Sequence, residues 1–230
     1  MNFHKIQRLI INTLLLGVIC ILPGCLTIQK MDKFVAGQYN NELPKQDKKK
    51  NPGITVTSSI PFATEDIATS SKKTSNMLPL LLYWQWDYRH TCTLHPAIAV
   101  GNFTKALNAQ ANKGLNQKLN GQQLELTVEQ VPNAFALVDK AHLIFLVLYA
   151  ISWDKLYVEP DLKDLVVSYK VLQNGSTVKS GKLSVKNNQQ NQNIRYFQSW
   201  KSATSEYLAT YNQDITNMTR LFVTNLVAEL

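Results

Sequence analysis

Strict two-residue alternation from residue 80 to residue 94 is the feature that most restricts how this 230-residue chain folds. Successive side chains of a β-strand point to opposite faces, so alternation over this length predicts a strand with two chemically different faces. One face is expected to pack in the core and carries Leu82, Trp84, Trp86, Tyr88, His90, Cys92 and Leu94. The opposite face carries Tyr83, Gln85, Asp87, Arg89, Thr91 and Thr93.

Two helices are expected around further strands. Apolar residues at helical spacing predict a helix of about 18 residues from an N-cap at Asn102 to a stop at Asn120-Gly121. A second, long amphipathic helix is expected from about 198 to 230, a stretch without proline or glycine.

The remaining strands are short. Strands are expected at 54–57 and 124–128, and a hairpin at 165–185 turns at Asn174-Gly175. Residues 134–153 are compatible with a buried helix or a central strand, and their β-branched and aromatic content favours the strand. Residues 62–76 are expected to form a surface loop. The order of these expected helices and strands predicts one α+β domain. It would contain a largely antiparallel sheet with two helices on one face, and the second of these is the long C-terminal helix.

The N-terminus carries an export pattern. Lys5 and Arg8 precede an apolar segment at 9–22, and Leu22-Pro23-Gly24-Cys25 ends it. These residues resemble the lipobox of bacterial lipoproteins, although proline before the glycine departs from the usual alanine or serine. The resemblance implies cleavage between Gly24 and Cys25, a diacylglyceryl group on the Cys25 thiol, and a third acyl chain such as palmitate on its amine. A plain secretory signal is the alternative, whereas about 14 residues are too few to span a bilayer.

The resemblance implies a location and a division of the chain. No aspartate follows Cys25, which favours the outer membrane, facing the periplasm, over the inner membrane or the cell surface. We expect a signal peptide at 1–24, a lipidated cysteine with a flexible tether at 25–53, and a folded periplasmic domain at 54–230. Loss of Lys5 and Arg8 with the signal would lower the net charge from +8 to +6. The expected partners are the membrane, through the acyl chains, and an envelope protein; export disfavours nucleic acid.

The cysteines and histidines offer one candidate for chemistry. Cys20 lies in the signal and Cys25 is the lipidation site, so Cys92 has no disulfide partner within the mature chain. His90, Cys92 and His95, with His142 as a conceivable third ligand beside the two that share a face, would provide atoms for a metal site. Cys92 with His90 or His95 would provide those of a Cys-His nucleophile. His95 has the wrong parity on a strand, so a buried strand end is the preferred interpretation. No cofactor is expected.

A binding surface is the other candidate. Tyr83 and Arg89 share the face opposite the expected core face, and they would form part of a binding platform if that face stays exposed. Packing of the neighbouring tryptophans in the core is the simpler explanation of the aromatic residues.

The order of elements is similar to that of auxiliary lipoproteins of envelope ABC-type transport systems, and to the lipoprotein plug partner of lipopolysaccharide assembly. The similarity is one of layout, without a shared residue motif. The first expectation is a non-enzymatic accessory or binding module. An auxiliary component of a lipid or solute transport system is the second, and a Cys- or metal-dependent hydrolase the third.

Overall fold

The computed structural model describes residues 26–44, 53–61, 64–80, 83–111, 114–146 and 149–230. Their strands form two sheets, one with the order β1-β4-β7-β8 and the other with the order β2-β3-β5-β6-β9. The α+β class and the long C-terminal helix are confirmed, while the strands divide between two sheets where the sequence predicts one. The helices are α2 (Ile28–Gln38), α3 (Pro96–Ala111), α4 (Leu115–Leu119) and α5 (Trp200–Glu229).

The first sheet forms one side of the core. It contains β1 (Ile54–Ser58), β4 (Gln123–Gln130), β7 (Leu165–Gln173) and β8 (Ser176–Val185), with β1 parallel to β4 and the other pairs antiparallel. Alternate residues of β4 and β7 are buried, as their sequence alternation predicts. The hairpin turn between β7 and β8 is at Asn174-Gly175, whose positive φ angles of 52° and 79° suit this turn. The buried residues of these two strands are Leu124, Leu126, Val128, Leu165, Val167, Tyr169 and Val171.

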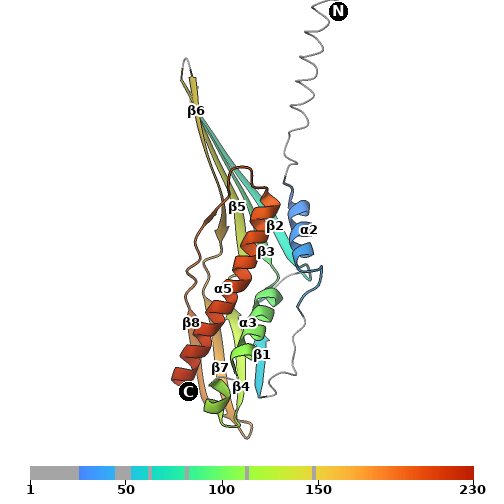
Figure 1. The fold of residues 1–230 in the computed structure, drawn as a ribbon, viewed down its shortest axis with the longest axis vertical. Coiled ribbons are helices and arrows are strands. Elements are labelled where there is room, and N and C mark those ends of the chain that lie inside the picture. The colour runs from blue at the N-terminus through green and yellow to red at the C-terminus, as the bar shows by residue number, and fades with distance from the viewer. Residues whose placement is uncertain (1–25, 45–52, 62–63, 81–82, 112–113, 147–148) are drawn as a thin grey trace, which may run out of the picture.

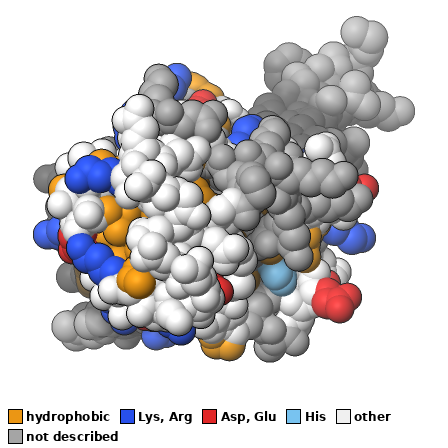
Figure 2. All heavy atoms as spheres, turned by 90° about the horizontal axis from the view of Figure 1, so that it is seen from below, with side chains coloured by type: hydrophobic (Ala, Val, Ile, Leu, Met, Phe, Trp, Pro, Cys, Tyr) orange, Lys and Arg blue, Asp and Glu red, His pale blue; other side chains and the backbone are white. Residues whose placement is uncertain are grey.

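Two helices, α3 and α5, lie on one face of this sheet (Figure 1). The C-terminal helix begins where the Ser199 hydroxyl accepts a hydrogen bond from the Ser202 N–H at 3.2 Å. It buries a stripe that includes Tyr211 and Phe222, and the Phe222 ring lies 5.5 Å from the ring of Phe103 in α3. The two helices and the sheet therefore share one continuous core. Figure 2, which views the molecule from below, shows lysine and arginine side chains at several places around its surface.

The predicted start of α3 at Asn102 is wrong, because the helix begins at Pro96. Proline lacks an N–H and suits a first helical turn, and the His95 ring accepts a hydrogen bond from the Ala97 N–H at 3.1 Å. Asn102 instead donates to the Asn212 side chain in α5 at 2.7 Å. The predicted stop is confirmed for α4, whose C-cap is Asn120 with a φ of 44°.

The second sheet consists mainly of two long hairpins, which lie in the sequence between elements of the first sheet and the helices. They comprise β2 (Ala68–Leu80) with β3 (Tyr83–Leu94), and β5 (Ala134–Leu146) with β6 (Tyr149–Pro160). Figure 1 shows these four strands leaving the helices and narrowing into a projecting arm, while the short β9 (Gln192–Asn193) pairs only with residues 157 and 158 near its base. The projecting part of β2, β3, β5 and β6 is called the arm below.

Two predictions for this sheet are wrong. Most of 62–76 is not a loop, because 68–80 forms β2, whose polar sequence shows no alternation and which pairs with β3 through its backbone. For 134–153 the choice of strand over helix is confirmed, but these residues are not one buried central strand, because they supply β5 and the start of β6, with Phe145 and Ile151 exposed.

The predicted flexible tether is also wrong for 28–38. These residues form α2, capped by the Thr27 hydroxyl, which accepts a hydrogen bond from the Lys30 N–H at 3.3 Å. Met31 and Val35, four residues apart on one face, are fully buried in the core, so the folded unit includes α2. Residues 45–52 lie outside the described residues. Among the described helices, none has the length and apolarity needed to cross a membrane.

Candidate ligand pocket

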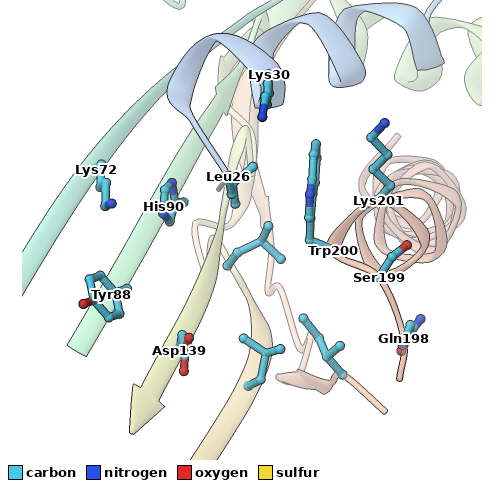
Figure 3. A pocket seen from close by; sticks show the side chains of 13 residues that line it. Leu26, Lys30, Lys72, Tyr88, His90, Asp139, Gln198, Ser199, Trp200 and Lys201 are labelled. Atoms are coloured by element: carbon cyan, nitrogen blue, oxygen red, sulfur yellow. The ribbon is translucent and has the colours of Figure 1, made fainter. Parts of the chain in front are cut away.

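A pocket of about 790 Å³ lies at the base of the arm. It is enclosed by the face of the second sheet that carries Tyr88 and His90, by the residues around the start of α2, and by the first residues of α5 (Figure 3). Its volume falls within the range of small-molecule sites, which is about 300–1,000 Å³. The apolar part of its lining comprises Leu26, Leu137, Leu156, Ile194 and Trp200.

The polar part of the lining is mainly basic. Lys30, Lys72 and Lys201 line the pocket, against the single carboxylate of Asp139. The Lys72 ammonium lies 5.3 Å from the centroid of the Tyr88 ring, and the Lys201 ammonium 5.8 Å from that of Trp200. Figure 3 shows that these two lysines come from opposite walls of the pocket, with the Trp200 ring between them.

Trp200 is held in place by its neighbours. Its ring meets the Phe34 ring of α2 edge-on, with 5.2 Å between centroids, and the Lys201 ammonium lies 5.9 Å from the Phe34 ring centroid. The start of α5 is thus fixed against α2, which keeps the two helical walls of the pocket together.

His90 lines the pocket from β3 and is only 7% exposed. Its Nδ1 is buried and has no hydrogen-bond partner among the described residues. Burial lowers the pKa of His90, and the positive charge of Lys72 lowers it further. Burial, together with the carboxylate of Asp154, raises the pKa of Asp139. The pocket is therefore lined by an imidazole and a carboxyl group whose pKa values are both shifted in favour of the uncharged form.

The lowered pKa of His90 predicts acid destabilisation. Below about pH 6.5, the usual pKa of histidine, the unfolded chain binds more protons than the folded chain, so the free energy of unfolding falls as the pH falls. His95, whose pKa is also lowered by burial, adds to this effect. Asp139 has a raised pKa and acts in the opposite direction at lower pH. Urea unfolding between pH 7.5 and 5.5 should show a smaller pH dependence for His90→Gln than for the unmodified protein; an equal dependence would contradict this assignment.

The candidate metal or Cys-His cluster does not assemble among the described residues. Cys92 is fully buried, and burial together with the nearby Asp32 carboxylate raises the pKa of its thiol to about 12. His95 uses its Nδ1 to cap α3, and His142 lies on the opposite face of the second sheet from His90 and Cys92. Among the described residues, no group of three or more histidine, cysteine, aspartate or glutamate side chains has metal-site geometry. The preferred interpretation of Cys92 as a buried thiol at a strand end is confirmed.

The structure does bring Tyr83 and Arg89 onto one face of the arm, as the alternation predicts. The Tyr83 hydroxyl lies 2.9 Å from His142 Nδ1, and the His142 ring stacks on Trp153 with 5.2 Å between centroids. Arg89 lies closer to the base, where its guanidinium donates to the Glu159 carboxylate at 2.6 Å.

Sequence reasoning missed His142 and Trp153 as members of this face. They come from the second hairpin, and only the strand register places them beside Tyr83. It also missed the pocket, whose walls come from segments more than 100 residues apart in the sequence. Cys25 and Gly24 lie outside the described residues, so lipidation and cleavage stay predictions.

Comparison with known proteins gives no relative for this chain. No protein-family model, curated protein or solved structure matches it.

Proposed function

We propose that this protein is a lipid-anchored accessory protein of the bacterial envelope that binds an amphipathic molecule with an anionic head group. The lipobox pattern at 1–25 supports the anchor and the periplasmic side of the outer membrane. The pocket at the base of the arm supports the ligand class, and it is the observation on which the proposal depends.

The lining of the pocket favours a molecule with two chemically different ends. The apolar wall favours an alkyl chain, because each buried methylene contributes about 0.8 kcal/mol. Lys72 and Lys201 favour a carboxylate or phosphate, to which an ammonium group binds as a point charge.

The place of Leu26 suggests where the ligand comes from. This residue lines the pocket and directly follows the predicted lipidation site Cys25. A lipidated N-terminus would hold the pocket close to the membrane surface. The same chemistry therefore has two sources, namely a free amphiphile taken from the membrane or an acyl chain of Cys25 itself.

An auxiliary role in an envelope transport system is the second candidate. A pocket suited to an amphiphile favours a lipid substrate for such a system over a polar solute. A hydrolase based on Cys92 is disfavoured, because a fully buried thiol with a pKa of about 12 is a poor nucleophile at neutral pH.

Binding of a fluorescent fatty acid to the full-length protein tests the proposal. Leu156→Trp places a larger side chain at the 41% exposed rim of the pocket, where the fold tolerates it, and should weaken binding about tenfold, equivalent to about 1.4 kcal/mol. Val178→Trp, at a 52% exposed position on β8, is the matched control and should bind normally. Equal affinity in the two variants would contradict the site.

Two further binding experiments identify the head group of the ligand and the source of the ligand. Lys72→Glu combined with Lys201→Glu should weaken binding of the fatty acid more than binding of its methyl ester, because only the acid carries a negative charge. Cys25→Ser should leave binding unchanged if the ligand is a free amphiphile. If an acyl chain of Cys25 occupies the pocket, only the Cys25→Ser protein should bind the probe.

A further inference from the structure

The arm carries apolar side chains on both faces near its tip. Ile144 pairs with Tyr83 on one side and with Ile151 on the other, so these three residues share one face. Phe145, one residue along the chain, points to the opposite face. Phe145 is 46% exposed and Ile151 is 50% exposed, which shows that the core covers neither face at this level.

Charged and apolar residues follow a definite order along the arm. Among the described residues at this end of the arm, the apolar ones are Leu143, Ile144, Phe145, Ala150 and Ile151. The aromatic residues Trp86 and Trp153 lie next along their strands. The charged residues begin at the level of Trp86, whose row also holds Asp154, and in the next row Lys140 lies between Asp87 and Lys155 in the strand register. At about 3.3 Å per residue, this charged row is about 13 Å from Ile144.

This order matches a lipid–water boundary. Apolar residues lie in the acyl region of a bilayer, tryptophan and tyrosine prefer the head-group level, and lysines face anionic lipids. A protein partner would need a deep groove to cover both faces of so narrow a tip, whereas lipids surround it without any matching shape.

We infer that the tip of the arm inserts into the head-group and outer acyl region of a lipid bilayer, as a membrane contact separate from the N-terminal anchor. The open edges of the arm limit its depth. In the described chain, β2 pairs on one side only, and β6 has a second partner only at 157 and 158. Unpaired backbone groups are not tolerated in hydrocarbon, so the charged row is expected to stay in water. The inference does not require the pocket to bind a ligand.

An environment-sensitive fluorescent amino acid at position 151 of the full-length protein tests the inference. The probe is compared on vesicles of phosphatidylethanolamine and phosphatidylglycerol with the same probe at position 178, which is 52% exposed on β8, outside the arm. The emission at 151 should shift to shorter wavelength and be quenched by bromine in the acyl chains, with neither effect at 178. Because each probe reports only its own surroundings, attachment through N-terminal acyl chains does not produce this difference.

A second variant keeps the test independent of the position of the probe. With the fluorescent residue at 145, Ile151→Asp should abolish the shift, while the circular dichroism spectrum stays unchanged because Ile151 is exposed. Equal, unquenched emission at 151 and 178 on vesicle-bound protein would overturn the inference. A concentration-dependent shift at 151 without vesicles would also overturn it, because it would assign the tip to contact between copies of the chain.

Discussion

Replacing Phe222 with alanine is expected to lower the free energy of unfolding by about 3–5 kcal/mol. The Phe222 side chain is fully buried, and its ring lies 5.5 Å from that of Phe103, at the contact between α5 and α3. Truncation removes the apolar surface of the ring from the core and leaves a cavity that two helices and a sheet cannot readily close. Urea unfolding followed by circular dichroism measures the change.

The adjacent residue provides the control. Leu221 precedes Phe222 in the same helix but is 55% exposed, so Leu221→Ala should change the free energy of unfolding by about 0.5 kcal/mol or less. Similar losses in the two variants would mean that α5 does not pack on α3 through Phe222.

Val35→Asp should destabilise the protein by about 3–5 kcal/mol, the range found when a buried charge is left without a partner. Val35 is fully buried, where α2 packs against the remainder of the fold. Lys33→Asp places the same side chain on the exposed side of this helix and should have little effect. Thermal unfolding of both variants distinguishes a docked helix from a flexible tether. In a flexible tether, neither substitution would change the unfolding temperature.

The position of α2 also matters for function. A docked helix fixes Leu26 at the pocket, and with it the point from which the predicted lipidated cysteine reaches the membrane. If the arm inserts as inferred, the protein meets the bilayer at two places, and the pocket lies near the base of the arm. An amphiphile leaving the membrane would then have only a short distance to travel.

The sequence predicted the elements whose side-chain pattern is set by burial on one side. Leu124, Leu126 and Val128 alternate with polar residues because one face of β4 meets the core, and the stripe on α5 has the same cause. The turn at Asn174-Gly175 was predictable because few other residue pairs adopt two successive positive φ angles.

Elements that depend on backbone pairing were not predictable in this way. The polar residues of β2 form a strand because β3 offers a row of backbone hydrogen bonds, and no apolar pattern records that. Met31 and Val35 are the two buried residues of α2, and two apolar positions among lysines and polar residues are too few to distinguish a helix from a linker in the sequence.

The alternation at 80–94 shows most clearly how far a sequence pattern can predict burial. It determined which side chains share a face, and the register confirms this for Tyr83 and Arg89. It did not determine what covers each face, since His90, Cys92 and Leu94 are buried while Trp86 and Tyr88 on the same face are only half-buried.

The sequence by itself therefore determined the α+β class, the long C-terminal helix and the local period of its strands, because these follow from residue size, polarity and turn geometry along the chain. Only the tertiary structure decided that two hairpins leave the core as an arm, that α2 docks, and that a basic, apolar-lined pocket forms between them. The physical reason is that burial is a property of neighbours in space, and these neighbours come from distant segments brought together by strand register and helix packing.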